Sequence, residues 1–292
     1  MGFLNALFGG SQLTPEEERQ EQTAKKFDLL KYDGVKALKT GQADYAVRCF
    51  HEAQKLREDL EVHDYLSQAL LQQGNLADAM AELQVLAVAE PENAQIQIRM
   101  AQVAYMQEDY AAMGEACEQA MKLEPDHAQP YFLCAQARQG RQDVVGAIAM
   151  LTKAIALRAD YADAYLLRAQ MLLGMGDTAS ADADAQWLLE HVAEHEDVLL
   201  LKARIEKAKG QVEDAIKVYD KVVEVNPFCI EAFSERGQLK FSMGDKVGAE
   251  QDMQMVLELD PQQLANVSGE FSAEGIEQKV RRAYSAINPL GL

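Results

Sequence analysis

EDVLLLKARIEKAKGQVEDAIKVYDKVVEVNPFC, residues 196–229, holds two helical patterns of apolar residues within 34 residues. Gly210-Gln211 separates the two patterns, and Asn226-Pro227 ends the second one. Glycine accepts the left-handed backbone conformation that ends a helix, and proline cannot continue one. The stretch therefore predicts two helices joined by a tight turn.

The same skeleton recurs seven times along the chain at a step of 34 residues, except that the first repeat is one residue shorter. Within each repeat, position 20 is alanine in six cases of seven, and position 8 is Gly, Ala or Ser in all seven. Small side chains let two helices approach closely, so we expect both columns where the helices of one repeat cross. The repeats start at Phe27, Leu60, Ala94, Ala128, Ala162, Glu196 and Ile230.

These columns resemble the tetratricopeptide-repeat (TPR) family, which also favours proline at position 32, as at Pro91, Pro125, Pro227 and Pro261 here. The resemblance covers residues 27–263. It implies an all-α, right-handed superhelical solenoid of about seven helix-turn-helix repeats. The chain departs from the family pattern at position 11, where no repeat has tyrosine, and at position 7, which is Lys202 and Arg236 in the last two repeats.

We expect three regions: an apolar segment over 1–13, the solenoid over 14–263, and a C-terminal capping helix and tail over 264–292. Thr14-Pro15-Glu16-Glu17 predicts a helix start with a capping box, and that helix should continue towards Thr40. The C-terminal helix would cover the last open face of the solenoid. It would do so with the apolar residues Ile276, Val280, Tyr284 and Ile287.

The first segment, MGFLNALFGGSQL, would present a narrow apolar stripe if it were helical, formed by Phe3, Leu4, Leu7 and Phe8. One interpretation is a frayed terminus. The other is a short anchor that packs on a partner, on a membrane surface or in the protein's own groove. Both interpretations remain open from the sequence.

Charge and composition exclude several classes of partner and site. The net charge of −19 and the pI of about 4.7 argue against binding nucleic acid, which needs surplus Lys and Arg near the phosphates. The four cysteines form no C-x-x-C pair, so we expect reduced, small core residues. The chain shows no basic signal region and no apolar run of membrane-spanning length, and we expect a cytoplasmic protein.

No catalytic motif, phosphate-binding loop or cofactor motif is present in the sequence. His191 and His195 are four residues apart and would share a helix face only if one helix continued through both. They lie where the repeat pattern ends its second helix, so we expect two exposed histidines without a metal. We therefore predict a protein that is not an enzyme and needs no cofactor.

The family resemblance implies that positions 2, 5, 9, 12 and 13 of each repeat line an inner, concave surface. Position 9 is glutamine in five repeats, and glutamine amides can pair with an extended peptide backbone. Glutamine is also a good former of exposed helix, and several apolar groups nearby could instead be buried between repeats. The candidate groove residues are Gln68, Gln102, Gln136, Gln170, Gln238, Ile98, Tyr105, Phe132, Leu166, Leu173, Leu200, Arg204 and Phe241.

The sequence thus predicts a scaffold that binds a peptide or protein segment in this groove. Clamping of a C-terminal carboxylate, as in some family members, is not supported, because Val35 stands at position 9 in the repeat that has Lys31 at position 5. The alternative is a structural or assembly protein. It would self-associate, or attach to a membrane surface, through residues 3–8.

Overall fold

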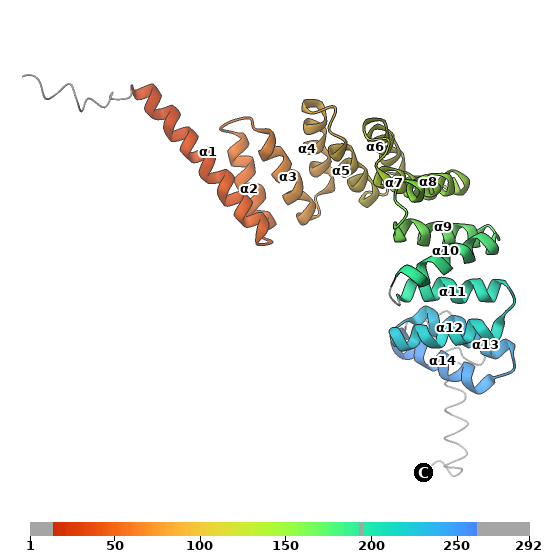
Figure 1. Ribbon diagram of the computed structural model, residues 1–292. Helices are drawn as coiled ribbons and strands as arrows, with labels where there is room; N and C mark the ends of the chain where they lie inside the picture. Colours follow the sequence, from red (N-terminus) through yellow and green to blue (C-terminus); the bar gives the residue numbers. More distant parts are fainter. Residues whose placement is uncertain (1–13, 193–194, 262–292) are drawn as a thin grey trace, which may run out of the picture. The chain divides into compact units, whose positions relative to one another are not determined.

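The computed structural model describes residues 14–192 and 195–261 (Figure 1), and every regular element in these ranges is an α-helix. The helices alternate along the chain as first and second helices of successive repeats. The first helices are α1 (Pro15–Lys39), α3 (Leu60–Gln73), α5 (Ala94–Met106), α7 (Ala128–Gly140), α9 (Ala162–Gly174), α11 (Glu196–Ala208) and α13 (Ile230–Ser242). The second helices are α2 (Ala43–Gln54), α4 (Leu76–Ala89), α6 (Tyr110–Leu123), α8 (Val144–Leu157), α10 (Thr178–His191), α12 (Val212–Val225) and α14 (Lys246–Leu259).

The prediction of an all-α protein built from helix-turn-helix repeats is confirmed. From α3 onward, each first helix begins at the residue where its repeat was expected to start. The expected apolar segment 1–13 and the expected helix within 264–292 lie outside the described residues.

The repeats form two compact units. Unit 1 ends at Ala159 and contains α1 to α8, whereas unit 2 begins at Asp160 and contains α9 to α14. The 34-residue pattern continues across this boundary without interruption. Periodicity therefore does not predict the division, which depends on contacts between elements.

The small-residue columns are buried in both units, as their conservation of size along the repeats predicted. Ala46, Ala79, Ala147, Ala181 and Ala215 at position 20 have no exposed surface. The same close packing explains two glycines at position 8. A Cβ atom on Gly34 would lie 2.5 Å from the Phe50 ring, and one on Gly237 would lie 3.1 Å from the Asp252 Cβ atom.

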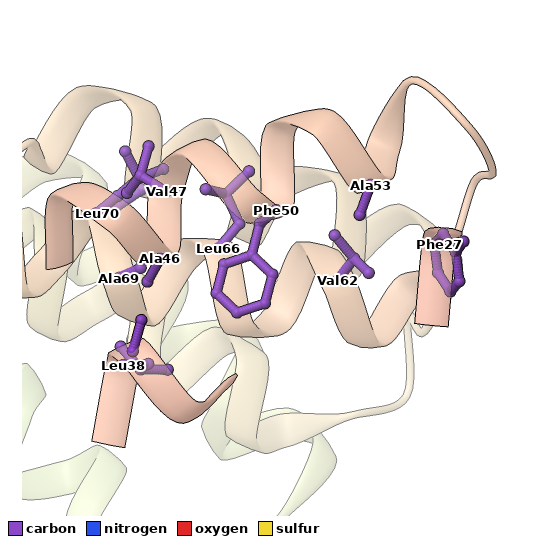
Figure 2. Close-up of a cluster of buried hydrophobic side chains, with 12 residues drawn as sticks. Phe27, Leu38, Ala46, Val47, Phe50, Ala53, Val62, Leu66, Ala69 and Leu70 are labelled. Atoms are coloured by element: carbon purple, nitrogen blue, oxygen red, sulfur yellow. The ribbon is translucent and has the colours of Figure 1, made fainter. Parts of the chain in front are cut away.

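Figure 2 shows the first core cluster of unit 1, in which side chains from α1, α2 and α3 interlock. Phe50 is fully buried at the centre of this cluster, and Phe27 lies at its end, beyond Ala53 and Val62. Each repeat thus completes its core with the first helix of the next repeat, as expected of stacked repeats.

The turn inside each repeat has the same backbone conformation in all seven cases. Five glycines at position 15 have positive φ, between 74° at Gly41 and 88° at Gly244. Glu108 and Gln142 take the same position in the third and fourth repeats, with φ of 57° and 64°. The geometry of the turn is therefore imposed by the packing of the two helices, even where the residue is not glycine.

An Asp or Asn at position 16 caps the second helix in five repeats. The side chains of Asn75, Asp109, Asp143, Asp177 and Asp245 each accept a hydrogen bond from a backbone N–H three residues later. Such caps stabilise a helix by about 1 kcal/mol each. The sequence prediction for this turn is confirmed.

Helix α1 is longer than the other first helices and begins with the predicted capping box. Thr14 accepts a hydrogen bond from the backbone N–H of Glu17, whose carboxylate accepts one from the backbone N–H of Thr14 at 2.7 Å. The helix ends at Lys39, and Thr40 is its C-cap. All residues from Pro15 to Lys26 are exposed, so this part of α1 extends beyond the core of the first repeat.

The four cysteines are free and buried, which confirms their expected place in the core. Burial raises the pKa of the Cys229 thiol to about 11, and burial likewise raises the pKa of the Cys117 thiol. These thiols are therefore protonated at neutral pH and poor nucleophiles. Among the helices of the described residues, none has the length and apolar character to span a membrane.

Candidate functional site

Three of the predicted groove glutamines lie on consecutive first helices of unit 1. Gln68 on α3 is half-buried and donates a hydrogen bond to the Asp64 carboxylate at 3.0 Å. Gln102 on α5 is exposed, and Gln136 on α7 is half-buried. Within residues 14–159, the side-chain amides of Gln102 and Gln136 make no hydrogen bond. Helices α5 and α7, which contact each other, therefore carry two side-chain amides that no other described group of unit 1 occupies.

The apolar residues predicted beside these amides have different environments. The Tyr105 side chain on α5 is 46% exposed, and Phe132 on α7 is half-buried. Ile98 is 2% exposed and packs in the core cluster that also contains Ala101 and Met113. Ile98 is thus a core residue that cannot contact a ligand directly. This is the burial between repeats that the sequence left open for the apolar candidates.

Unit 2 carries the remaining predicted residues on α9, α11 and α13. Gln170 and Gln238 are exposed, and their amides make no hydrogen bond among the described residues of this unit. Leu166 and Leu173 are half-buried, and Phe241 is 61% exposed. Leu200, at 5% exposure, belongs to the core of α11 to α13 and is not available at the surface.

Arg204 was predicted as a cationic groove residue, but its charge is neutralised within unit 2. Its guanidinium donates to Glu235 at 2.9 and 2.6 Å and to Glu231 at 2.6 Å. The hydrogen bond to Glu235 raises the pKa of Arg204. Burial would raise the pKa of Glu235, but hydrogen bonds from Arg204 and Tyr219 hold it below its usual value. This network binds α11 to α13 and leaves Arg204 no free charge for an anionic ligand.

Two basic side chains on first helices of unit 1, Lys31 at position 5 and Arg99 at position 6 of its repeat, are paired in the same way. Lys31 donates to Asp59 at 3.1 Å and also contacts Glu61. Arg99 contacts Asp64 and donates to the Ser67 hydroxyl at 2.5 Å. A carboxylate or phosphate group of a ligand would have to compete with these internal carboxylates, so the face is not built as an anion site.

Sequence reasoning missed a set of buried ion pairs between positions 7 and 23 of a repeat. Arg168 pairs with Asp184 at 2.7 Å, and Arg236 pairs with Asp252 at 2.6 Å. Both aspartates are at most 5% exposed. The signal was present in the sequence. In these two repeats an arginine stands at position 7 and an aspartate at position 23, 16 residues later, where most other repeats have apolar residues.

Repeat two has a related arrangement around a buried histidine. His63, 7% exposed, lies between Glu58 at 2.7 Å and Glu82, and Gln54 also contacts its ring. Burial would lower the pKa of His63, but hydrogen bonds to Glu82 and Glu58 raise it above its usual value. These groups connect α2, α3 and α4 and are structural.

His191 and His195 lie on different elements. His191 is the last residue of α10, where its ring stacks on Trp187 at 4.4 Å between centroids. His195 is the N-cap of α11 and accepts a hydrogen bond from the backbone N–H of Asp197. In residues 14–192 and 195–261, no three His, Cys, Asp or Glu side chains are placed to hold a metal ion.

Comparison with known families gives one match. A model described as the tetratricopeptide repeat matches residues 34–94, 66–128 and 200–263. Together these matches cover 95 residues in 34–128 and 64 in 200–263, which is more than half of the 292 residues. No curated protein sequence matches the chain.

Several solved structures resemble the fold at low sequence identity. A tetratricopeptide repeat protein from Parabacteroides merdae has a TM-score of 0.66 and 14% identity, and the match covers 81% of this chain and 94% of that one. PilF of Pseudomonas aeruginosa has a TM-score of 0.57 and 15% identity, over 70% and 94%. YrrB, described as a TPR protein with an unusual peptide-binding site, has a TM-score of 0.52 and 15% identity, over 61% and 92%. At these identities the likeness establishes the fold alone.

Proposed function

The chain belongs to the tetratricopeptide-repeat family, and on that premise we propose that it is a non-enzymatic scaffold for a protein partner. The proposed site is the face of α5 and α7 in unit 1, where an extended segment of the partner would lie across Gln102 and Gln136. One observation carries this proposal: the two amides lie on helices that contact each other, both reach the surface, and neither makes a hydrogen bond among the described residues of the unit.

The chemistry of the face supports a segment recognised through its backbone. Each glutamine amide has both a donor and an acceptor, as a peptide group does, so the two can pair irrespective of the segment's sequence. Tyr105, 46% exposed beside Gln102, adds apolar contact area. The related fold of YrrB, which its description credits with a peptide-binding site, is consistent with this use.

The pairing of Lys31 and Arg99 with carboxylates bears on whether the bound partner segment is a chain end or an internal stretch. Their charges are already compensated, so neither side chain supplies a free cation for a C-terminal carboxylate or a phosphate. We therefore expect an internal, extended segment of the partner rather than a chain end.

A peptide-display selection tests this proposal. Random 12-residue peptides would be selected on the full chain, and the affinity of the selected peptides measured by fluorescence anisotropy for Gln102→Ala/Gln136→Ala. Loss of two hydrogen-bonding amides, at about 1 kcal/mol each, predicts a roughly thirtyfold weaker Kd. The matched control is Gln84→Ala/Gln119→Ala, because Gln84 and Gln119 are exposed glutamines on the second helices α4 and α6. Equal affinities for both variants would contradict the proposed site.

A further inference from the structure

The first three turns of α1 have no packing partner in the core of unit 1. Every residue from Pro15 to Lys26 is exposed, and Phe27, at 1% exposure, is the first residue of the helix that is buried. A helical segment of this length is only marginally stable in water by itself. Its persistence as a helix would be favoured by a further element packed against it.

A cavity of about 650 Å³ lies in the corner between this part of α1 and the loop that follows α2. Ala24 and Phe27 of α1 and Leu56 of the loop give it an apolar base. The Arg57 guanidinium stands 3.7 Å above the Phe27 ring and pairs with Asp59 at 3.1 Å, so its charge is compensated. The cavity continues along α1 to Pro15 and Glu16, past Arg19, Gln20 and Thr23.

The chain itself supplies a segment with suitable chemistry at the end of this cavity. Residues 1–13, MGFLNALFGGSQL, contain no charged side chain and six large apolar ones, of which Phe3, Leu4, Leu7 and Phe8 form the predicted stripe. They join α1 at Thr14, directly beside the lining residues Pro15 and Glu16.

The lengths involved allow the segment to return along α1. At 1.5 Å rise per residue, Ala24 lies about 14 Å and Phe27 about 18 Å from Pro15 along the helix. The six residues from Thr14 back to Phe8 can span about 20 Å when extended. Phe8 can therefore reach the apolar base of the cavity.

We propose that Phe3, Leu4, Leu7 and Phe8 of the chain's own N-terminal segment occupy this cavity and cover the exposed Ala24 and the half-buried Leu56. The covalent link between this segment and α1 favours the chain's own segment over the same segment of a second copy. A short tether gives an effective concentration of about millimolar, which exceeds a micromolar protein concentration by roughly a thousandfold.

Disulfide trapping in the full chain tests the proposal. Phe8→Cys would be combined with Thr23→Cys, which lies in the cavity, or with Gln22→Cys, which is exposed but does not line it. The native cysteines are buried and do not compete. The proposal predicts a monomeric disulfide that forms at least tenfold faster for the 8–23 pair than for the 8–22 pair. Equal rates would overturn it, and so would disulfides formed mainly between two copies.

Hydrogen exchange provides a second measurement that does not need cysteines. We expect amide exchange in 15–26 to accelerate at least fivefold in Leu7→Ser/Phe8→Ser and in Ala24→Arg. Gln22→Arg, the matched control with the same added charge, should leave this exchange unchanged. Unchanged exchange in Leu7→Ser/Phe8→Ser, or uptake of the segment by phosphatidylcholine vesicles without any change in 15–26, would refute the cavity as its site.

Discussion

At glycines where an added methyl group meets open space, the sign of a glycine-to-alanine substitution should depend on backbone conformation alone. Gly74 in the turn of repeat two has a φ of 79°, whereas Gly114 lies inside α6 without a positive φ. A Cβ atom at either position would meet nothing within 4 Å. The two substitutions therefore add the same methyl group to open space, and steric contact does not distinguish them.

The expected magnitudes follow from the conformational preferences of alanine. The left-handed conformation costs an L-residue about 1–2 kcal/mol, and removing glycine from the unfolded chain returns roughly 0.4–1 kcal/mol. Gly74→Ala should therefore destabilise unit 1 by about 1 kcal/mol. Gly114→Ala should stabilise it by about 0.5–1 kcal/mol, because alanine is the better helix former.

The reverse substitution is available in the same unit. Glu108 holds the left-handed position in the third repeat with a φ of 57°. Glu108→Gly should remove the strain and stabilise unit 1 by about 0.5–1 kcal/mol after the entropy cost of glycine.

Urea unfolding followed by far-ultraviolet circular dichroism measures these effects. For a slope of about 2 kcal/mol per molar urea, 1 kcal/mol moves a midpoint by about 0.5 M. The only tryptophan, Trp187, is in unit 2, so its fluorescence reports that unit separately. A stabilising Gly74→Ala, or a destabilising Glu108→Gly with an unchanged slope, would refute the backbone explanation.

Three further predictions concern the buried polar groups and the tightest contact. The raised pKa of His63 gives a stabilisation that is complete below its unfolded value of about 6.5 and is lost as the pH rises through the folded value. The urea-midpoint advantage of the wild type over His63→Gln should thus shrink between pH 6 and pH 9, and an advantage that grows would contradict this sign. Asp252→Ala should cost about 3 kcal/mol of unfolding free energy, because the buried Arg236 loses both hydrogen bonds to Asp252 and keeps only the half-exposed Asp220 as a partner. Arg236→Met/Asp252→Leu should cost much less, as thermal unfolding of both variants would show. Gly34→Ala should lower the melting temperature, at a cost of about 1–3 kcal/mol, because the new Cβ atom would lie 2.5 Å from the Phe50 ring and the ring must move. Adding Phe50→Leu to this variant should recover part of the loss.

The repeat architecture was predictable because its signals are local and recur in phase. The turn of the fourth repeat illustrates this, since Gln142 there is no helix-ending residue by itself. Its place at position 15, where five other repeats have glycine, was sufficient to predict a turn that the structure has with a φ of 64°. The capping box at Thr14 and Glu17 was equally predictable, because it needs only four consecutive residues.

The candidate site was less predictable, because exposure depends on neighbouring repeats. Ile98 and Phe132 occupy the same position of adjacent repeats, yet Ile98 is 2% exposed and Phe132 is half-buried. A position number gives the direction of a side chain from its helix and not the depth at which the next helix covers it. The charge of Arg204 could not be judged either, since its partner Glu235 lies 31 residues away.

The division into two units was not predictable from the sequence either. It falls between Ala159 and Asp160 although the sequence pattern is regular on both sides. The division depends on contacts between helices, which a single column of the repeat does not report.

The central claim is that Gln102 and Gln136 bind the backbone of a partner segment. A double-mutant cycle on a selected peptide tests it most directly, with backbone N-methylation of the peptide as one change and Gln102→Ala/Gln136→Ala as the other. We predict that N-methylation at the contacted residues weakens binding to the wild type by about tenfold or more and has little further effect on the double variant. Additive losses would mean that the glutamines and the peptide backbone do not interact, and the proposed mode of binding would be wrong.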